Sequence, residues 1–238
     1  MKVMDANELY DPEFRELIKS KKPTIIIPVG SLEQHGAHLP ITTDSDIVTE
    51  IASRLAEKCG FIVFPTISYG ISDEHKPLFN ISIQSKNWRG FLGDIFQSLL
   101  TSYHEIIFLN GHHGNNEALN KLQKTMNKQY VHGNLLPVRC YSYWHFMEHE
   151  FDHAGFVETS LMLAISDKVK MKKAKKGLIT KGLNEKERKR INKLSTEPGG
   201  FPKVTKNGVW GDPTGATKKD GEKFLAEIVR NLAKECQS

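Results

Sequence analysis

The sequence predicts an α/β fold of the doubly wound type, in one domain that spans residues 1–238. Two observations predict it. Short apolar runs rich in β-branched residues alternate along the chain with amphipathic helical patterns, as in a parallel sheet whose strands are covered on both faces. In addition, no internal repeat indicates a solenoid or a propeller. A chain of this length can bury a core without disulfide support.

Four segments have the composition of strands. The runs TIIIPV and EIIFLN are almost continuously apolar, which favours strands that are buried on both faces. The predicted strands cover residues 24–29, 61–66, 105–110 and 134–142.

Five segments repeat apolar residues at helical spacing. The first ends at Gly60, a residue type that favours the left-handed conformation just after a helix. The predicted helices cover residues 45–60, 87–103, 115–130, 153–166 and 217–234. The Pro- and Gly-rich stretch at 195–217 predicts a long loop, and loops of that length in a compact domain are often functional.

The composition is that of an ordinary globular protein, with 39% hydrophobic and 26% charged residues. No apolar run approaches the roughly 20 residues that cross a bilayer, and the charged amino terminus lacks the apolar core of a signal peptide. The three cysteines form no CxxC pair, so neither a disulfide framework nor a zinc ribbon is predicted. We therefore expect a cytoplasmic protein with no membrane partner.

The net charge of +5 is concentrated in a basic segment at residues 168–193. No aromatic side chains are interleaved there, as they would be on a surface that stacks bases, so we expect no nucleic-acid partner. Two interpretations of the segment stay open. Its cations form a solvated helix-and-loop surface, or some of them attract an anionic substrate such as a phosphate.

Metal-capable side chains follow two of the predicted strands. Glu33, His35 and Asp44 come after the first strand, and His112 comes after the third. Because ligands of such sheets bind beyond the carboxyl ends of the strands, we expect the two groups to converge at one edge. Glu33 and His35 are two residues apart and point to the same side of an extended chain. These side chains suit Zn or Mn; the alternative is a polar network without metal.

A third cluster, in the run DHAGFVETS, contains His153 and Glu158. The two residues are five apart, so they face different directions on an ideal helix unless His153 lies outside it. His153 is either a capping or core residue, or a further member of the site at the sheet edge.

Four motifs together resemble the creatininase family: PVGSLEQHGAHLPITTD, FLNGHHGNNEAL, HAGFVETSLML and GVWGDPTGAT. They occur in the family's order, and the resemblance extends over about residues 24–233. It implies a three-layer α/β/α fold with a mostly parallel central sheet, commonly in a homo-hexamer. It also implies two divalent metal ions per subunit (Zn, Mn or Fe) near the strand ends.

Carried over to this sequence, the resemblance implies that Glu33 and His112 bind one metal ion and His35 binds the other. Asp44 would bridge the two ions. His153 would assist proton transfer, and Glu158 would lie beside the metals. These assignments come from the family motifs and not from the spacing of the residues.

The sequence departs from creatininase at three places. Creatininase has a glutamate that binds the second metal two residues after the histidine of its NGH motif, where this chain has Gly114. Glu158 is therefore the candidate second-metal ligand, or it orients the attacking water. The Pro-Gly-Thr that follows the family's Glu-His pair is absent after His75, which either faces the pocket or has a structural role. The aromatic clamp of creatininase has no clear counterpart before His153, although Trp144 lies nearby.

The resemblance implies hydrolysis of a non-peptide amide C–N bond by a metal-activated water, with His153 relaying the proton to the leaving nitrogen. The residues alone would equally allow phosphoester hydrolysis. We expect a small-molecule amide substrate, with or without a phosphate, and favour the formamide of a formylaminopyrimidine ribonucleotide in flavin and deazaflavin biosynthesis. Creatinine amidohydrolase or precursor-peptide peptidase activity is the alternative, and a non-catalytic metal-binding protein is a further one.

Overall fold

The computed structural model describes all residues except 1–3, 22, 101–104, 131–137 and 238. Its central sheet has five strands in the order β1-β4-β2-β6-β7, and every neighbouring pair is parallel. The strands are β1 Met4–Asp5, β2 Thr24–Val29, β4 Ile62–Val63, β6 Glu105–Asn110 and β7 Val138–Ser142. A second, antiparallel sheet joins β3 Leu32–Glu33 to β5 Asn80–Ile81. The predicted parallel α/β architecture is confirmed.

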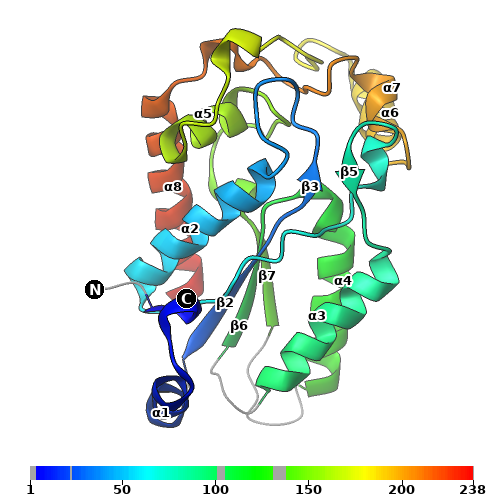
Figure 1. The fold of residues 1–238 in the computed structure, drawn as a ribbon. Coiled ribbons are helices and arrows are strands. Elements are labelled where there is room, and N and C mark those ends of the chain that lie inside the picture. Colours follow the sequence, from blue (N-terminus) through cyan, green and yellow to red (C-terminus); the bar gives the residue numbers. More distant parts are fainter. Residues whose placement is uncertain (1–3, 22, 101–104, 131–137, 238) are drawn as a thin grey trace.

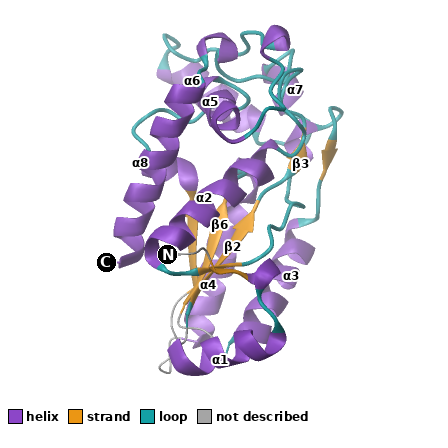
Figure 2. Ribbon diagram, turned by 60° about the vertical axis from the view of Figure 1, so that its left-hand side comes forward, coloured by secondary structure: helices purple, strands orange, loops and turns teal. Residues whose placement is uncertain are grey.

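Helices cover both faces of the sheet (Figure 1). One face carries α2, α5 and α8, and the other carries α3 and α4. The bounds are α1 Asp11–Lys21, α2 Thr43–Cys59, α3 Ser85–Leu99, α4 Asn116–Tyr130, α5 Phe156–Ile165 and α8 Lys218–Gln237. Two further helices, α6 Glu185–Ser195 and α7 Phe201–Val204, lie beyond the carboxyl ends of the strands together with α5 and β3 (Figure 2).

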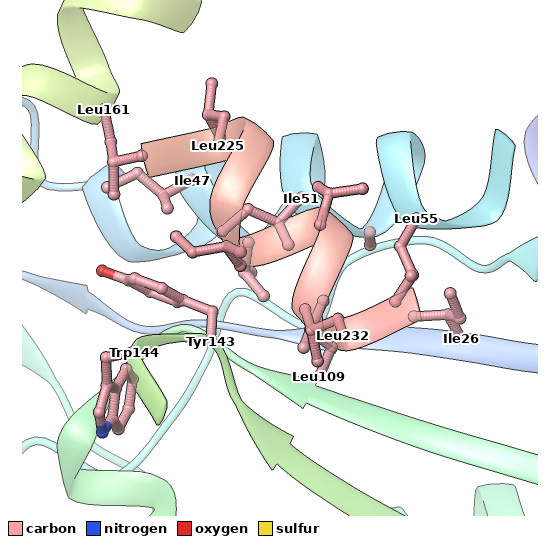
Figure 3. Close-up of a cluster of buried hydrophobic side chains, with 14 of the residues drawn as sticks. Ile26, Ile47, Ile51, Leu55, Leu109, Tyr143, Trp144, Leu161, Leu225 and Leu232 are labelled. Carbon is pink, nitrogen blue, oxygen red and sulfur yellow. The ribbon is translucent and has the colours of Figure 1, made fainter. Parts of the chain in front are cut away.

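The alternation of side chains along the strands creates two separate cores. Ile26 and Leu109 face the helices α2, α5 and α8, whereas Ile25 and Phe108 face α3 and α4. Each fully buried side chain of this kind contributes about 1.5–3 kcal/mol of burial free energy. Figure 3 shows the first core, in which Ile51 and its neighbours in α2 pack between the sheet and α8. Both faces of the sheet are thus fixed, and its strand ends are held in place.

Most predicted elements are present, with corrected bounds. β2 and β6 have the predicted bounds, and Gly60 ends α2 in the left-handed conformation (φ 73°) while its N–H donates to the Ala56 carbonyl. The predicted strand 61–66 keeps only Ile62–Val63 as a regular strand. Pro65 has no N–H to continue the ladder, although Phe64 N–H still donates to the Ile26 carbonyl (2.9 Å).

Other parts of the prediction lie outside the described residues or missed an element. The tail of the predicted helix 87–103 and the start of the predicted strand 134–142 lie outside the described residues. The long loop at 195–217 contains the short helix α7, and α1, β1, β3 and β5 were not predicted. Among the described residues, no helix is both long and apolar enough to cross a membrane.

Candidate metal centre

The segment that follows β2 brings three of the predicted ligands to the edge of the sheet. After β2 ends at Val29, the chain enters β3, where Glu33 pairs with Asn80 of β5. Glu33, His35 and Asp44 are almost fully buried, and the Ser31 hydroxyl donates to Glu33 Oε2 (3.1 Å). Asp44 lies in the first turn of α2, where the positive end of the helix dipole favours a carboxylate.

His112 joins this group from the next strand. It follows β6, and its Nδ1 lies 3.1 Å from Asp44 Oδ2. Its Nε2 lies 2.8 Å from the Ile71 carbonyl, which can only accept, so Nε2 carries a hydrogen and Nδ1 is the ring nitrogen that faces Asp44. Gly111 is required here because a Cβ on it would lie 2.6 Å from the Asp44 carbonyl oxygen. The convergence expected from the strand order is present.

His35 is oriented in the same manner. Its Nδ1 lies 3.2 Å from the backbone carbonyl of Glu33, which accepts its hydrogen, and its Nε2 lies 3.1 Å from Asp44 Oδ1. Histidines that bind metals generally donate their second ring N–H to a carbonyl or carboxylate in this way. Both imidazoles therefore direct one ring nitrogen at the carboxylate of Asp44, and that nitrogen can bind a metal ion once its proton has left.

Two three-residue groups have potential ligand atoms that all lie within 4.8 Å of one another. One is Glu33, Asp44 and His112; the other is His35, Asp44 and Glu158. Asp44 belongs to both groups, so one carboxylate can bridge two ions. A third such group joins Glu33 and His35 to His153.

The buried oxygens of the site fit a divalent cation. Within the described part of the chain, Glu33 Oε1, Asp44 Oδ2 and Glu158 Oε1 are buried and have no hydrogen-bond partner. Glu33 Oε1 does lie 3.0 Å from His75 Nε2, and Asp44 Oδ2 lies 3.1 Å from His112, but without hydrogen-bond geometry. Buried carboxylate oxygens without partners are costly, and a mixed imidazole and carboxylate set is one that Zn or Mn accepts.

The pKa shifts of the metal-free site also indicate a site that fits a cation. Burial opposes charge on His35, but the carboxylates of Asp44, Glu158 and Glu33 outweigh it and raise its pKa to about 10. Burial, reinforced by the Asp44 charge, raises the pKa of Glu158 to about 8 although His35 opposes the shift. Burial alone would raise the pKa of Asp44, but His35 and His112 hold it well below its usual range. Without a cation, the site therefore holds protons in place of metal charge.

His153 lies outside α5, which begins only at Phe156. The predicted helix start at residue 153 is wrong, because Ala154 has a positive φ of 52° and breaks the helical path. His153 is fixed by backbone hydrogen bonds in both directions with Trp210, at 3.0 and 2.8 Å. Consequently His153 and Glu158 both reach the same cavity, which an unbroken helix would have prevented.

The surroundings of His153 disfavour the charged form of its imidazole. Burial, together with the nearby His35 and His75, holds its pKa well below the usual value. Its Nε2 lies 3.1 Å from both the backbone carbonyl and the side-chain amide nitrogen of Gln34. Its Nδ1 lies on the side of Glu33, 3.9 Å from Oε1. One ring nitrogen is thus held in place, and the other lies beside the metal groups.

A cavity of about 240 Å³, here called the inner cavity, brings these groups together. Its lining includes Glu33, Asp44, His112, His153 and Glu158. It also includes His75, for which the sequence left two roles open, as well as Glu74, Phe151, Asp152, Phe201 and Trp210.

Sequence reasoning missed several of these residues. Phe201 packs on the rings of His75 and His153, with centroids 4.5 and 4.8 Å apart. Phe151 lines the cavity, and Trp144, which the sequence analysis named, stacks on Phe151 with ring centroids 4.6 Å apart. Asp152 accepts the N–H of Val157 (3.0 Å) at the start of α5, and a carboxylate just before a helix is the available signal for that role.

Comparison with known proteins decides the family. The family model for creatininase, described as creatinine amidohydrolase, matches residues 7–236. The chain belongs to the creatininase family. It is accordingly a metal-dependent amidohydrolase, and the resemblance seen in its motifs is confirmed.

Individual relatives refine this placement. The chain is 33% identical to the mycofactocin precursor peptide peptidase of Mycobacterium ulcerans, over 89% of this chain and 84% of that protein. It is 26% identical to the creatinine amidohydrolase of Pseudomonas putida, over 67% of this chain and 71% of that protein. A crystal structure of creatininase superposes with a TM-score of 0.83 at 23% identity, covering 99% of this chain and 97% of the other. Two further solved creatininases are titled as a Zn-Zn type mutant and as a Mn form.

The surroundings of Gly114 leave no room for a side chain. A Cβ on Gly114 would lie 2.1 Å from the Ile71 carbonyl oxygen and 2.5 Å from His112 Nε2. No larger side chain fits at residue 114 unless its surroundings move. The carboxylate of Glu158 lies close to His35 and Asp44, with Oε2 3.6 Å from His35 Nε2.

Proposed function

We propose that this protein hydrolyses a C–N amide bond of a precursor peptide at a centre of two divalent metal ions. The observation that carries the proposal is the pair of buried ligand groups that share Asp44. Glu33 and His112 would hold one ion, and His35 and Glu158 would hold the other. When bound, the ions would polarise the amide carbonyl and lower the pKa of a water molecule between them.

The protein's own groups supply the proton chemistry. The Nδ1 of His153 lies beside the metal ligand groups, where it can accept a proton, and Gln34 holds its Nε2 in place. A proton taken up at Nδ1 from the attacking water can then be delivered to the leaving nitrogen. Phe201 covers the rings of His153 and His75, which keeps bulk water away from this transfer.

The class of amide is inferred from the relatives. The curated proteins with 30–33% identity over about nine tenths of this chain are named as peptidases of a precursor peptide. The creatinine amidohydrolase is more distant, at 26% identity over a smaller share of the chain. These relatives favour a peptide substrate over creatinine and over the formylaminopyrimidine ribonucleotide that the sequence analysis placed first.

A panel of substrates tests the proposal. The protein is stripped with a chelator, reloaded separately with Zn, Mn or Fe, and assayed for amine release from short peptides, creatinine and a formylaminopyrimidine ribonucleotide. We expect metal-dependent release from peptides. Turnover confined to creatinine or to the ribonucleotide would reassign the substrate, and bound metal without any turnover would support a non-catalytic protein. Light scattering on the 27.0 kDa chain tests the hexamer that we propose by analogy with the family.

A further inference from the structure

A second cavity opens directly beside the inner cavity and is here called the outer groove. It measures about 590 Å³. Four residues line both spaces: Phe151, Asp152, Asn192 and Trp210. The inner cavity, at about 240 Å³, is smaller than the roughly 300–1,000 Å³ usual for a ligand pocket. A substrate that reaches the metal groups and is larger than the inner cavity therefore has the outer groove available to it.

Helix α6 runs along both spaces with one face. Arg188 lines the outer groove, Asn192 lines both, and Ser195 and Thr196 line the inner cavity. Their spacing of four, three and one residues places them along the same side of the helix. The eight residue steps from Arg188 to Thr196 span about 12 Å at 1.5 Å per residue. That length corresponds to about three or four residues of extended peptide.

The outer end of this face is cationic. Arg188 and Lys181 both line the groove, are exposed, and form no ion pair within the described residues. On the same helix, Lys189 pairs with Glu185 at 2.6 Å. The groove also contains the carboxylate of Asp212, but that group already accepts hydrogen bonds from the N–H and the hydroxyl of Thr214.

The remaining walls of the outer groove are of mixed character. They combine apolar side chains, Phe151, Phe156, Ile179 and Trp210 among them, with polar ones, and two further acidic residues, Glu150 and Asp152, also line the groove. A lining that combines apolar side chains with a few charged groups is typical of ligand-binding sites. Of the Lys and Arg side chains in the basic segment at 168–193, those of Lys181 and Arg188 line the groove. An anionic substrate can therefore be attracted by these two cations, while the other cations of the segment lie away from the groove.

We infer that the outer groove binds the part of the substrate that extends beyond the scissile amide. In this inference Arg188, supported by Lys181, binds a carboxylate on the part of the substrate that runs along α6, about three to four residues out from the inner cavity. The inference rests on the proposed peptide hydrolysis and narrows its substrate class to peptides that are acidic at this distance. Arg is suited to the role because its planar guanidinium can form two parallel hydrogen bonds to one carboxylate.

A binding assay tests the inference without requiring turnover. Zinc-loaded full-length protein is titrated with fluorescent peptides that end in a hydroxamate, a group that chelates divalent metals. The hydroxamate is placed at the carboxyl end in one set and at the amino end in the other. The fourth residue from it is Glu or the isosteric Gln. Arg188→Ala is compared with Arg190→Ala, which removes the same exposed residue type from α6 two positions away, outside both cavities.

In one of the two sets, wild type and Arg190→Ala are expected to bind the Glu peptide about three- to ten-fold more tightly than the Gln peptide. Arg188→Ala should bind both equally, and Arg188→Glu should prefer a Lys peptide. The preference should shrink at high salt. Equal binding of the Glu and Gln peptides by wild type, or a preference that survives in Arg188→Ala, overturns the inference.

The outcomes also separate this inference from the proposed function. Peptide cleavage without a charge preference refutes only the role of the groove. A charge preference that depends on Arg188 without cleavage of any peptide refutes the proposed function and leaves the groove as a carboxylate site. A ribonucleotide phosphate that competes in an Arg188-dependent manner, where the peptide carboxylate has no effect, shows that the assignment to peptides is wrong.

Discussion

Replacing Glu158 with Gln is expected to remove one metal ion and leave the other. Gln has the same size and keeps an oxygen that can accept the N–H of Ala154, which donates to Glu158 Oε2 at 2.6 Å. The start of α5 should therefore keep its geometry. What is lost is the negative charge and the buried Oε1, which has no hydrogen-bond partner within the described residues.

The magnitude follows from the number of ligands. A structural zinc site contributes about 10–16 kcal/mol through four ligands, or about 3 kcal/mol for each. Loss of one ligand therefore weakens binding about 100-fold. Glu33, Asp44 and His112 do not include the changed residue, so their ion should stay bound. We expect kcat/KM to fall about 10²–10³-fold, as when one group that stabilises the oxyanion is removed.

Mass spectrometry of metal content after dialysis against a weak chelator measures the effect, with hydrolysis assayed on the same samples. Glu74→Gln is the matched control, because Glu74 also lines the inner cavity, with Oε1 3.6 Å from His112 Nε2, but belongs to neither ligand group. Wild type and the control should hold two ions per chain, and Glu158→Gln should hold one. Two ions in Glu158→Gln with activity lost would show that Glu158 orients water and is not a ligand. Two ions with full activity would refute any role at the centre.

Four further outcomes are expected. Asp44→Asn should lose both ions, because Asp44 belongs to both ligand groups; metal analysis measures this. His153→Gln should keep both ions while kcat falls about 10²–10⁴-fold, as for loss of a proton-transfer group. Gly208→Ala should lower the unfolding free energy by about 1–3 kcal/mol in urea titrations, since φ is +72° and a Cβ would lie 1.8 Å from Gln34 Oε1. Metal affinity should weaken as pH falls, because the pKa of metal-free His35 is raised to about 10 and its proton must leave on binding; calorimetry in two buffers counts the protons released.

Each of these outcomes has a control or a contradicting result. Gly215→Ala is the control for Gly208, since a Cβ there meets nothing within 4 Å; equal stability of the two variants would contradict the steric reasoning. Asp44→Asn that kept one ion would show that Asp44 does not bridge. Unchanged kcat in His153→Gln would exclude an essential proton relay. Metal binding that released no protons would contradict the protonated state of the metal-free site.

The sequence predicted the half of the site that follows from strand order. Glu33, His35, Asp44 and His112 come from segments after two adjacent parallel strands, and such segments necessarily meet at one edge of the sheet. Burial on both faces made β2 and β6 easy to recognise, because their apolar runs are almost continuous. The local sequence pattern was sufficient for these residues, because adjacent parallel strands bring the segments that follow them close together.

The rest of the site depends on conformations that no local pattern reveals. The positive φ of Ala154 moves His153 out of the predicted helix, although alanine gives no signal for this conformation. Phe201, Trp210 and Asn192 reach the cavities from the region beyond residue 185, where composition indicated only a basic surface and a long loop. Their positions are set by tertiary contacts, such as the Trp210 backbone pairing with His153.

The run Glu33-Gln34-His35 shows how one short segment can serve two parts of the mechanism. Glu33 and His35 each belong to one of the two ligand groups that share Asp44. Gln34, between them, places its side-chain nitrogen 3.1 Å from ring nitrogens of both His75 and His153. The period of two along an extended chain sends neighbouring side chains to opposite sides. The metal ligands and the group that positions the proton-transfer histidine are therefore fixed by the same stretch of backbone, so a shift of this loop would disturb metal binding and proton transfer together.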